Sequence, residues 1–291
     1  MLEVWIQAIR PRTLVAAIVP VMVGCSLAHA GGSFTSWPAL LCLGFALLVQ
    51  VGTNFANDYY DFRKGADGPE RLGPARTVSS GLIAPGVMWR AMVCVLLLAF
   101  VVGLGLLPFG GWMLLCVGLA SLVCAIAYTG GPFPLAYLGL GDVFVIAFFG
   151  LVAVAFTFFV QAGEFTADAW LAGLAVGLVI NNLLVVNNYR DMEEDRRSRK
   201  RTLAVRFGRP FSLWQFWGQT LGACACTGWI SVVDKWFWLL PMLVLGFLGR
   251  QVMHRLATAN SSEEFVVCLG LTARMVPVFG ILLCGGILLS D

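Results

Sequence analysis

Two short stretches of this chain concentrate oxygen-bearing side chains, and each follows directly on a long apolar run. Residues 54–67 read NFANDYYDFRKGAD, and residues 187–202 read NNYRDMEEDRRSRKRT. Together they hold seven of the chain's 16 acidic residues, although they make up only a small part of its 291 residues. Such a concentration of acids in an otherwise apolar chain indicates that the two stretches carry the chemistry.

Helical spacing would group these side chains on one face at each place. Asp191 and Asp195 are four residues apart, as are Asn57 and Asp61, and Asp58 lies three residues before Asp61. Carboxylates gathered at a membrane boundary repel one another, so something must neutralise them. Oxygen ligands suit hard divalent cations, and Mg²⁺ typically completes its shell with water and substrate phosphate. The two stretches therefore predict cation sites that share one substrate diphosphate.

The predicted site draws on side chains of three kinds from both stretches and on Arg76, which follows the first stretch. The predicted metal ligands are Asn57, Asp58, Asp61, Asp67, Asp191 and Asp195. Basic residues suit the phosphate oxygens, and the predicted diphosphate contacts are Lys64, Arg76, Lys200 and Arg201. The predicted substrate contacts in the two stretches are the amides of Asn54, Asn187 and Asn188. For the outer acids Glu70, Glu193 and Glu194, local ion pairing with nearby Arg and Lys residues is the simpler interpretation.

Lipid must surround the elements that position these residues. The chain is 59% hydrophobic and 12% charged, with a mean hydropathy of +0.85, whereas soluble domains average about 25% charged residues. Apolar runs of about 20 residues, long enough to cross a bilayer, recur nine times, at 13–30, 38–56, 88–108, 111–128, 140–160, 169–188, 212–232, 236–253 and 265–289. We therefore predict an all-α polytopic membrane protein of about nine transmembrane helices, forming a single domain over residues 1–291. Its expected surroundings are membrane lipid, and we expect no nucleic-acid partner.

The placement of basic residues favours one orientation, because cytoplasmic loops are enriched in Lys and Arg. With a cytoplasmic N-terminus, every Lys and Arg except Lys235 and Arg274 falls in a cytoplasmic segment. Both acidic stretches then face the cytoplasm, from the inner or plasma membrane. The two longest loops, about 62–87 and 190–211, are predicted to cap the cytoplasmic mouth.

The first residues resemble a signal peptide, because Arg10 and Arg12 precede an apolar stretch. Apolar residues also precede Arg10, however, and further spans follow. We therefore expect an uncleaved first span with a short interfacial helix before it.

Four stretches together resemble the UbiA superfamily of intramembrane prenyltransferases, over essentially the whole chain. Asn57-Asp58-x-x-Asp61 resembles the first aspartate motif, and Asp191-x-x-x-Asp195 resembles the second, with Lys200 and Thr202 after it. The four stretches are RPRTL (10–14), NDYYDFRKGADGPERLGPARTVSSG (57–81), YTGGPFPLAYLGLGD (128–142) and VNNYRDMEEDRRSRKRTLAVRFG (186–208). Within the superfamily the likeness is greatest to the branch that prenylates 1,4-dihydroxy-2-naphthoate.

Two departures from the wider superfamily change the expected ligand set. The usual third acid of the first motif would stand at Gly65, and the next acid is Asp67. The superfamily also often has Tyr-x-x-x-Lys after the fourth span, whereas Tyr128 is followed at that spacing by Pro132. The diphosphate must then rely on other bases, which are Lys64, Arg76 or Lys200.

The resemblance implies a ring of nine helices around a central cavity, open to the cytoplasm and sideways to lipid. It also implies Mg²⁺ as cofactor, with two ions. The implied reaction transfers a polyprenyl group from polyprenyl diphosphate to 1,4-dihydroxy-2-naphthoate. Carbon dioxide and diphosphate are lost and demethylmenaquinone forms, which is a step of menaquinone biosynthesis. Other acceptors, such as 4-hydroxybenzoate or homogentisate, are the alternative, and haem O and chlorophyll synthases share the fold.

The resemblance also assigns catalytic roles, which we expect for Asp61, Asp191, Asp195, Tyr128 and Asp142. The allylic cation formed in such a reaction must be kept from water, and aromatic faces such as Tyr59, Tyr60 or Tyr128 could stabilise it. Ionisable residues inside a span are functional by default. Asp142 and Arg274 are therefore the candidates for a group near the substrate carboxylate.

Two other classes of membrane protein fit the sequence less well. The CDP-alcohol phosphatidyltransferases require DGxxAR, whereas here six residues separate Asp67-Gly68 from Ala75-Arg76. An ion-coupled transporter would place its acids near the bilayer midplane, whereas these acids lie at the ends of predicted spans.

Overall fold

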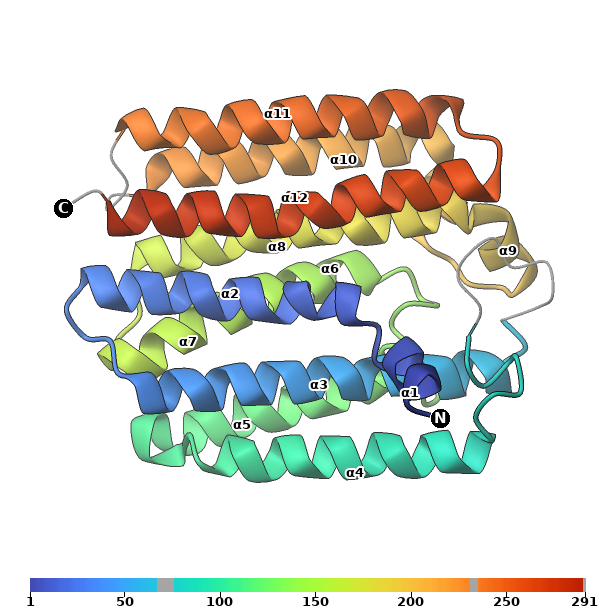
Figure 1. Ribbon diagram of the computed structural model, residues 1–291, viewed down its shortest axis with the longest axis horizontal. Helices are drawn as coiled ribbons and strands as arrows, with labels where there is room; N and C mark the ends of the chain where they lie inside the picture. The colour runs from blue at the N-terminus through green and yellow to red at the C-terminus, as the bar shows by residue number, and fades with distance from the viewer. Residues whose placement is uncertain (67–75, 231–234, 290–291) are drawn as a thin grey trace.

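The computed structural model of this chain describes residues 1–66, 76–230 and 235–289, and every regular element in those ranges is a helix (Figure 1). The long helices run side by side along the molecule. The helices are α1 (Leu2–Ile9), α2 (Pro11–Ala30), α3 (Ser36–Arg63), α4 (Pro85–Leu104), α5 (Leu107–Ala127), α6 (Gly141–Val145), the π-helical turn η1 (Ile146–Val152), α7 (Ala153–Ala162), α8 (Ala167–Arg190), α9 (Met192–Arg197), α10 (Leu203–Trp229), α11 (Lys235–Thr258) and α12 (Ser262–Leu288).

Seven of the described helices are long and apolar enough to cross a membrane. They are α2, α3, α4, α5, the continuous helix formed by α6, η1 and α7, α8, and α12. The predicted class, an all-α polytopic membrane protein, is confirmed. Helices α10 and α11 occupy the positions of the predicted seventh and eighth spans and run beside the others (Figure 1). Because they are not among the seven, the count of nine spans stays a prediction.

Helix α10 begins nine residues before the predicted span, at Leu203. Thr202 caps its N-terminus, because the Thr202 side chain accepts a hydrogen bond from the Val205 backbone N–H at 3.4 Å. A kink at Gly208 (φ 81°) separates this first segment from the rest of the helix. The predicted cap loop at 190–211 is therefore wrong as a loop, since α9 and the start of α10 replace most of it. Of the other predicted loop, 62–87, residues 67–75 lie outside the described ranges.

The short lead-in helix predicted before the first span is α1, and a buried amide fixes its junction with α2. The Asn54 side chain donates from Nδ2 to the Ile9 carbonyl oxygen (2.8 Å) and to the Thr13 hydroxyl (2.9 Å). Asn54 thus links α1 and α2 to α3. Asn54 was predicted to contact the substrate, but its side-chain nitrogen donates these two structural hydrogen bonds.

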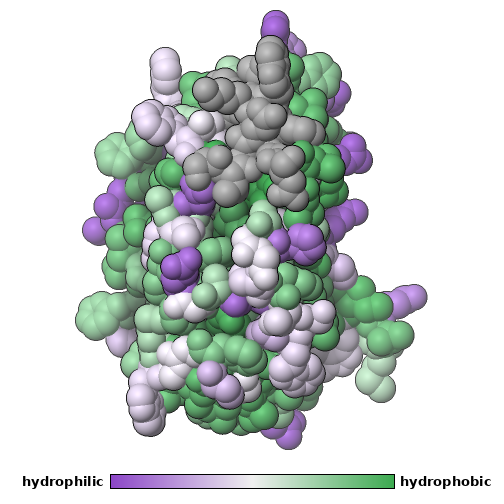
Figure 2. All heavy atoms as spheres, turned by 90° about the vertical axis from the view of Figure 1, so that its left-hand side faces the viewer, coloured by the Kyte–Doolittle hydropathy of each residue, from purple (hydrophilic) through white to green (hydrophobic). Residues whose placement is uncertain are grey.

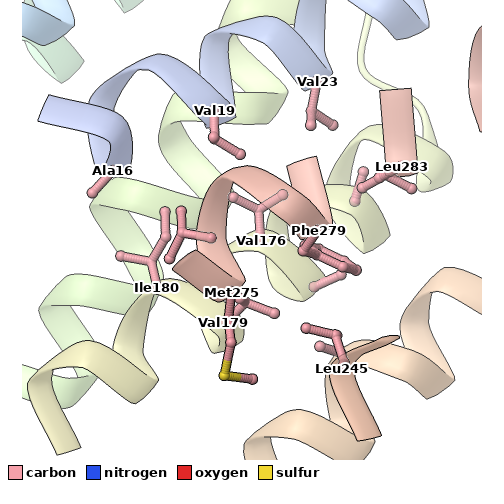
Figure 3. Packing of buried hydrophobic residues seen from close by; sticks show 14 of the residues in the cluster. Ala16, Val19, Val23, Val176, Val179, Ile180, Leu245, Met275, Phe279 and Leu283 are labelled. Carbon is pink, nitrogen blue, oxygen red and sulfur yellow. The ribbon is translucent and has the colours of Figure 1, made fainter. Parts of the chain in front are cut away.

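The long helices form a closed ring, because each packs against the next in sequence and α12 packs against α2. The ring is not open at its centre, because α12 also packs across it against α8, and α2 packs against α7. Figure 3 shows the resulting core, where Val19 of α2, Val176 of α8, Leu245 of α11 and Phe279 of α12 meet. All four are at most 4% exposed, so the C-terminal half of the ring is solidly filled.

The main cavity therefore lies off centre, between the N-terminal helices and the helix formed by α6, η1 and α7. It has a volume of about 170 Å³, and its walls are almost entirely apolar. Small residues such as Ala16, Ala46 and Gly118 line it and leave the space open. The ring and its cavity agree with the predicted architecture, except that the cavity is displaced from the centre. Figure 2 looks at the end far from the two aspartate motifs and shows hydrophobic surface with scattered polar side chains.

Candidate active site

Helices α3 and α8 end at the same end of the molecule, although their motifs are more than 100 residues apart in sequence (Figure 1). The last turns of α3 carry Asn57, Asp58 and Asp61. The end of α8 and the short helix α9 carry Asp191 and Asp195. The two predicted cation sites thus lie on one side of the molecule.

One aromatic side chain, Tyr137, joins the two motifs. Its hydroxyl donates a hydrogen bond to Asp61 Oδ1 at 2.9 Å. The Lys64 ammonium lies 4.3 Å from the centre of the Tyr137 ring, and the Lys200 ammonium lies 5.7 Å from it. Lys200 also forms an ion pair with Asp195 at 3.3 Å. Asp61 and Asp195 therefore face a common space, bridged by Tyr137 and Lys200.

Tyr137 reaches this place because the segment between α5 and α6 is wedged between the two motifs. A side chain at Gly130 would meet the Tyr60 ring at 2.5 Å, so this glycine lets the segment lie against α3. A side chain at Gly139 (φ 76°) would overlap the carbonyl oxygen of Arg201. On that side the Arg201 N–H donates to the Tyr137 carbonyl oxygen at 2.9 Å. Backbone contacts on both sides thus hold Tyr137 in the space between the motifs.

Three motif carboxylates are each paired with a basic side chain. The pairs are Asp61 with Arg76 (3.2 Å), Asp191 with Arg190 (2.5 Å) and Asp195 with Lys200 (3.3 Å). Burial raises the pKa of Asp195 to about 6, with Lys200 opposing the rise and Asp191 and Asp61 adding to it. The pKa of Lys200 is raised, because the attraction of Asp195, Asp61 and Asp191 outweighs the effect of burial. The shared space thus brings three carboxylates together with their basic partners, which gives it ligands for a cation and donors for a phosphate.

Asp58 is held by hydrogen bonds to the polypeptide, and its role as a metal ligand stays a prediction. It is 1% exposed, and its Oδ2 accepts hydrogen bonds from the Thr77 hydroxyl (2.6 Å) and the Thr77 N–H (3.2 Å). Its Oδ1 accepts from the Val78 N–H at 3.3 Å. The polypeptide thus engages both oxygens of Asp58. By fixing Thr77, it places the neighbouring Arg76 beside Asp61.

Two other predicted residues of the first motif, Asn57 and Lys64, both contact Thr129. The Asn57 Oδ1 accepts a hydrogen bond from the Thr129 hydroxyl at 2.9 Å, and the Lys64 ammonium donates to the Thr129 carbonyl oxygen at 2.5 Å. Burial lowers the pKa of Lys64, while Asp61 opposes that effect. Asp67, the remaining predicted ligand of this motif, lies outside the described residues.

The remaining predicted residues lie in different places. Asn188 is buried on α8 and lines a small polar pocket, and Asn187 is half-buried one residue earlier. The Arg201 side chain is exposed beside the site. Arg274 is exposed on α12 and lines neither of the two cavities described here, so the structure does not bring it to the site. Among the outer acids, Glu193 pairs with Arg196 at 2.8 Å, as the simpler interpretation predicts.

The donor chemistry of the shared space fits a hard divalent cation. Within the described ranges no three His, Cys, Asp or Glu residues already form a metal-binding group. Carboxylates of Asp61, Asp191 and Asp195 supply oxygen ligands, and their basic partners would have to yield to an incoming ion.

Tyr128 stands between the two cavities, because it lines both of them. On one side is the apolar cavity, where Gln50 and Thr53 are among the few polar residues in the wall. On the other is a polar pocket of about 10 Å³ that includes Asp142 and Lys200. The apolar cavity can hold a hydrocarbon chain, while the charged groups lie beyond Tyr128.

The sequence offered little indication of several residues that complete this arrangement. Tyr137 and Thr129 lie in the stretch 128–142, whose resemblance to the superfamily was noted without a role for either. Asn181 and Gln215, which hold Asp142, lie inside apolar runs. A buried polar residue within a span was the available signal.

Membrane-spanning helices enclose an apolar cavity here, and two carboxylate-rich helix ends lie beside it, as is expected of an intramembrane prenyltransferase. The profile of the UbiA prenyltransferase family matches residues 17–269, and this chain belongs to that family.

Named relatives resemble the chain over most of its length. The 1,4-dihydroxy-2-naphthoate octaprenyltransferase of Escherichia coli (strain K12) is 35% identical over 267 residues, covering 87% of this chain and 86% of that protein. The protein of the same name from Mycobacterium tuberculosis (strain ATCC 25618 / H37Rv) is 34% identical over 283 residues, covering 97% and 96%.

A solved structure confirms the fold. The structure of a UbiA homolog from Archaeoglobus fulgidus bound to DMAPP and Mg²⁺ matches with a TM-score of 0.68 and 15% identity, covering 97% of this chain and 99% of that chain.

Proposed function

We propose that this chain transfers a polyprenyl group from polyprenyl diphosphate to 1,4-dihydroxy-2-naphthoate, with release of diphosphate and carbon dioxide. The product is demethylmenaquinone, so the reaction belongs to menaquinone biosynthesis. The acceptor is supported by the relatives, which carry the name 1,4-dihydroxy-2-naphthoate octaprenyltransferase and match most of the chain. The observation that carries the reaction type is the meeting of Asp61 and Asp195 around Tyr137, with Tyr128 leading to an apolar cavity.

The polyprenyl tail lies in the apolar cavity and the diphosphate lies between the two motifs. Lys64 and Lys200 both lie over the Tyr137 ring, so both ammonium groups are within reach of one diphosphate. Arg76 beside Asp61 provides a third base. Charge-assisted hydrogen bonds from these bases bind the phosphate oxygens. The exposed Arg201 is a further contact at the edge of the site.

Asp61, Asp191 and Asp195 would hold Mg²⁺, with the Asn57 amide as a neutral ligand, and we propose two ions, one for each motif. When bound, Mg²⁺ neutralises the charge that grows on the departing diphosphate. The homolog from Archaeoglobus fulgidus was solved with Mg²⁺ and DMAPP, which supports a divalent ion in this family. Arg76 and Lys200, which pair with Asp61 and Asp195 here, would then turn to the phosphate oxygens.

The residues around Tyr128 suit the carbon chemistry. The bond between the prenyl C1 and the diphosphate oxygen breaks, and its electron pair leaves with the diphosphate. The allylic cation that remains is shielded from water by the helices around the cavity. The face of Tyr128, which lines the cavity, stabilises positive charge. The electron-rich naphthoate ring then forms the new carbon–carbon bond, and loss of its carboxyl group as carbon dioxide restores the aromatic ring.

The chain acts as a single domain in the plasma or inner membrane, with the site facing the cytoplasm. The basic residues cluster at the end that carries the motifs, which is the cytoplasmic end by the positive-inside rule. A reporter cysteine at the exposed Arg199 of the cysteine-free protein should react with an impermeant maleimide only after spheroplasts are opened. Equal labelling of closed spheroplasts would contradict this orientation.

A product assay tests the reaction. Membranes containing the protein are incubated with Mg²⁺, mixed prenyl diphosphates and three competing acceptors: 1,4-dihydroxy-2-naphthoate, 4-hydroxybenzoate and homogentisate. We expect a prenylated naphthalenediol whose mass lacks the carboxyl group, together with released carbon dioxide. Asp61→Ala membranes serve as the blank. A product formed only from 4-hydroxybenzoate or homogentisate would overturn the proposed acceptor but keep the proposed reaction type.

A further inference from the structure

The polar pocket beyond Tyr128 is too small for a ring or a carboxylate. Its volume is about 10 Å³, which is close to the lower limit for a single water molecule. Its walls combine a hydrogen-bond acceptor, the Asp142 carboxylate, with a donor, the Lys200 ammonium. Asn188 and Thr202 add groups that can donate or accept. A single hydroxyl group fits this size and this mixture of partners.

Two amides from different helices fix Asp142 at the edge of this pocket. Asn181 of α8 donates to Asp142 Oδ1 at 2.9 Å, and Gln215 of α10 donates to the same oxygen at 2.5 Å. Asp142 is 6% exposed and stands in the first turn of its helix, where the helix dipole favours a negative charge. Because Asn181 and Gln215 both donate to Oδ1, the Asp142 carboxylate is held in one orientation, in which it can accept a further hydrogen bond.

Charge decides which part of an aromatic acceptor Asp142 can bind. A carboxylate accepts hydrogen bonds and repels another carboxylate. Asp142 therefore suits a hydrogen-bond donor better than the substrate's own carboxylate, near which it was also predicted to lie. A ring hydroxyl can donate to Asp142 and accept from Lys200, the base that pairs with Asp195.

We propose that Asp142 accepts a hydrogen bond from a ring hydroxyl of the aromatic acceptor, and that Asn181 and Gln215 are the positioning residues that hold Asp142 for this contact. This inference rests on the proposed function, because it names the acceptor subsite of the same site. The hydroxyl enters the polar pocket while the ring lies against Tyr128, on the path to the apolar cavity. A hydroxyl bonded to a carboxylate also pushes electron density into the ring, and so favours attack on the prenyl cation. No proton transfer to Asp142 is required.

The Asp142→Asn variant tests the contact directly. A hydrogen bond to a charged group is worth about 1.5–3 kcal/mol, so we expect the KM for the acceptor to rise roughly 10- to 100-fold. The KM for the prenyl diphosphate should change by less than about threefold, because Asp142 makes no contact with the donor. If Asp142→Asn raises the KM for the acceptor and the KM for the prenyl diphosphate equally, or raises neither, the proposal is overturned.

Matched controls separate positioning from folding. Asn181→Ala is compared with Asn182→Ala, because Asn182 is also fully buried on α8 but donates to Thr220 at 3.0 Å instead. Gln215→Leu is compared with Gln219→Leu, one turn further along α10. We expect only the Asn181 and Gln215 variants to raise the acceptor KM selectively. Equal effects within each pair would show a purely structural role.

Acceptor analogues keep the proposal testable if a variant folds poorly. The two monomethyl ethers of 1,4-dihydroxy-2-naphthoate each lack one hydroxyl hydrogen. With one of them the wild-type protein and Asp142→Asn should differ by less than about threefold, because the hydrogen bond is already lost. If the ratio stays the same for both ethers and for the parent compound, the inference is wrong.

Failure of the proposed function is distinguishable from failure of the Asp142 contact. If the proposed function is wrong, the wild-type protein does not prenylate 1,4-dihydroxy-2-naphthoate but uses another phenol. The effect of Asp142→Asn on the acceptor KM would then be measured with that phenol.

Discussion

Thr77 donates two hydrogen bonds to the Asp58 carboxylate, one from its hydroxyl at 2.6 Å and one from its backbone N–H at 3.2 Å. The pair joins α3 to the segment that precedes α4. One consequence is that the first aspartate motif is divided between two tasks. Asp58 holds the polypeptide in place, while Asp61, one turn later, faces the second motif through Tyr137.

Removing Asp58 should reduce stability as well as activity. In Asp58→Ala the buried N–H groups of Thr77 and Val78 lose their acceptor, and each unsatisfied group costs about 1–3 kcal/mol. Thr77→Val removes only the hydroxyl and should lower the melting temperature less. Thermal unfolding of the detergent-purified protein, followed by tryptophan fluorescence, measures both. An Asp58→Ala protein that melts like the wild type but has no activity would favour a metal-binding role for Asp58 instead.

Removing a motif carboxylate that faces the shared space should abolish the reaction. We expect Asp61→Ala and Asp191→Ala to lower the rate of diphosphate release by about 100-fold or more, because the developing charge loses its electrostatic partners. Membrane insertion should be unchanged. The control is Glu193→Ala, which removes an exposed acid that pairs with Arg196. Near-normal turnover in either aspartate variant would disprove the proposed two-motif scheme.

Tyr137 should contribute through its hydroxyl and its ring separately. Tyr137→Phe loses the hydrogen bond to Asp61 but keeps the ring near Lys64 and Lys200, so kcat/KM should fall roughly 3- to 10-fold. Tyr137→Ala should reduce kcat/KM further, because both lysines lose the ring. Phe133→Ala, an exposed aromatic of the same segment, is the matched control. Equal kcat/KM values for the Phe and Ala variants would show that the ring contributes nothing.

The apolar cavity should set which donors are accepted. Gly118 lines it, and a Cβ there has room, with the Phe45 ring 3.8 Å away. In Gly118→Leu the added side chain should occupy the cavity. Turnover of octaprenyl diphosphate should then fall about tenfold relative to geranyl diphosphate, since a poorly fitting methylene costs roughly 1–3 kcal/mol. Gly218→Leu on the exposed face of α10 adds the same side chain elsewhere. An unchanged donor ratio in Gly118→Leu would place the tail outside this cavity.

Binding of Mg²⁺ should depend on the protonation of Asp195. Its pKa is raised to about 6, mainly by burial, so the carboxylate is ionised above pH 6 and protonated below it. A cation needs the ionised form, and affinity for Mg²⁺ should therefore be lost as the pH falls through about 6. Calorimetric titration of the purified protein with Mg²⁺ from pH 5 to 8 measures this. In Asp195→Asn the step near pH 6 should disappear, and its persistence would assign the titration to another group.

The sequence predicted where the two motifs lie, but not the hydrogen-bond partners of their residues. The i,i+4 spacing of Asp191 and Asp195 and the apolar runs before both motifs were sufficient to place the motifs at span ends. The use of Asp58 could not be predicted, because its hydrogen-bond partner Thr77 lies 19 residues away across a loop. The predicted role of Arg274 stays a prediction, because the side chain is exposed on α12. Its position inside a predicted span indicated function, but only the packing of α12 decides which way its side chain points.

By itself, the sequence determined the helical membrane class, the family and the two carboxylate-rich helix ends. These follow from hydrophobic run length and short-range spacing, which are local properties of the chain. Only the tertiary structure decided that Tyr137 joins the motifs, that the cavity lies off centre, and that Asn181 and Gln215 hold Asp142. Such relationships join residues far apart in sequence. They depend on how the ring of helices closes and on which helices pack across it, and no local pattern encodes that packing.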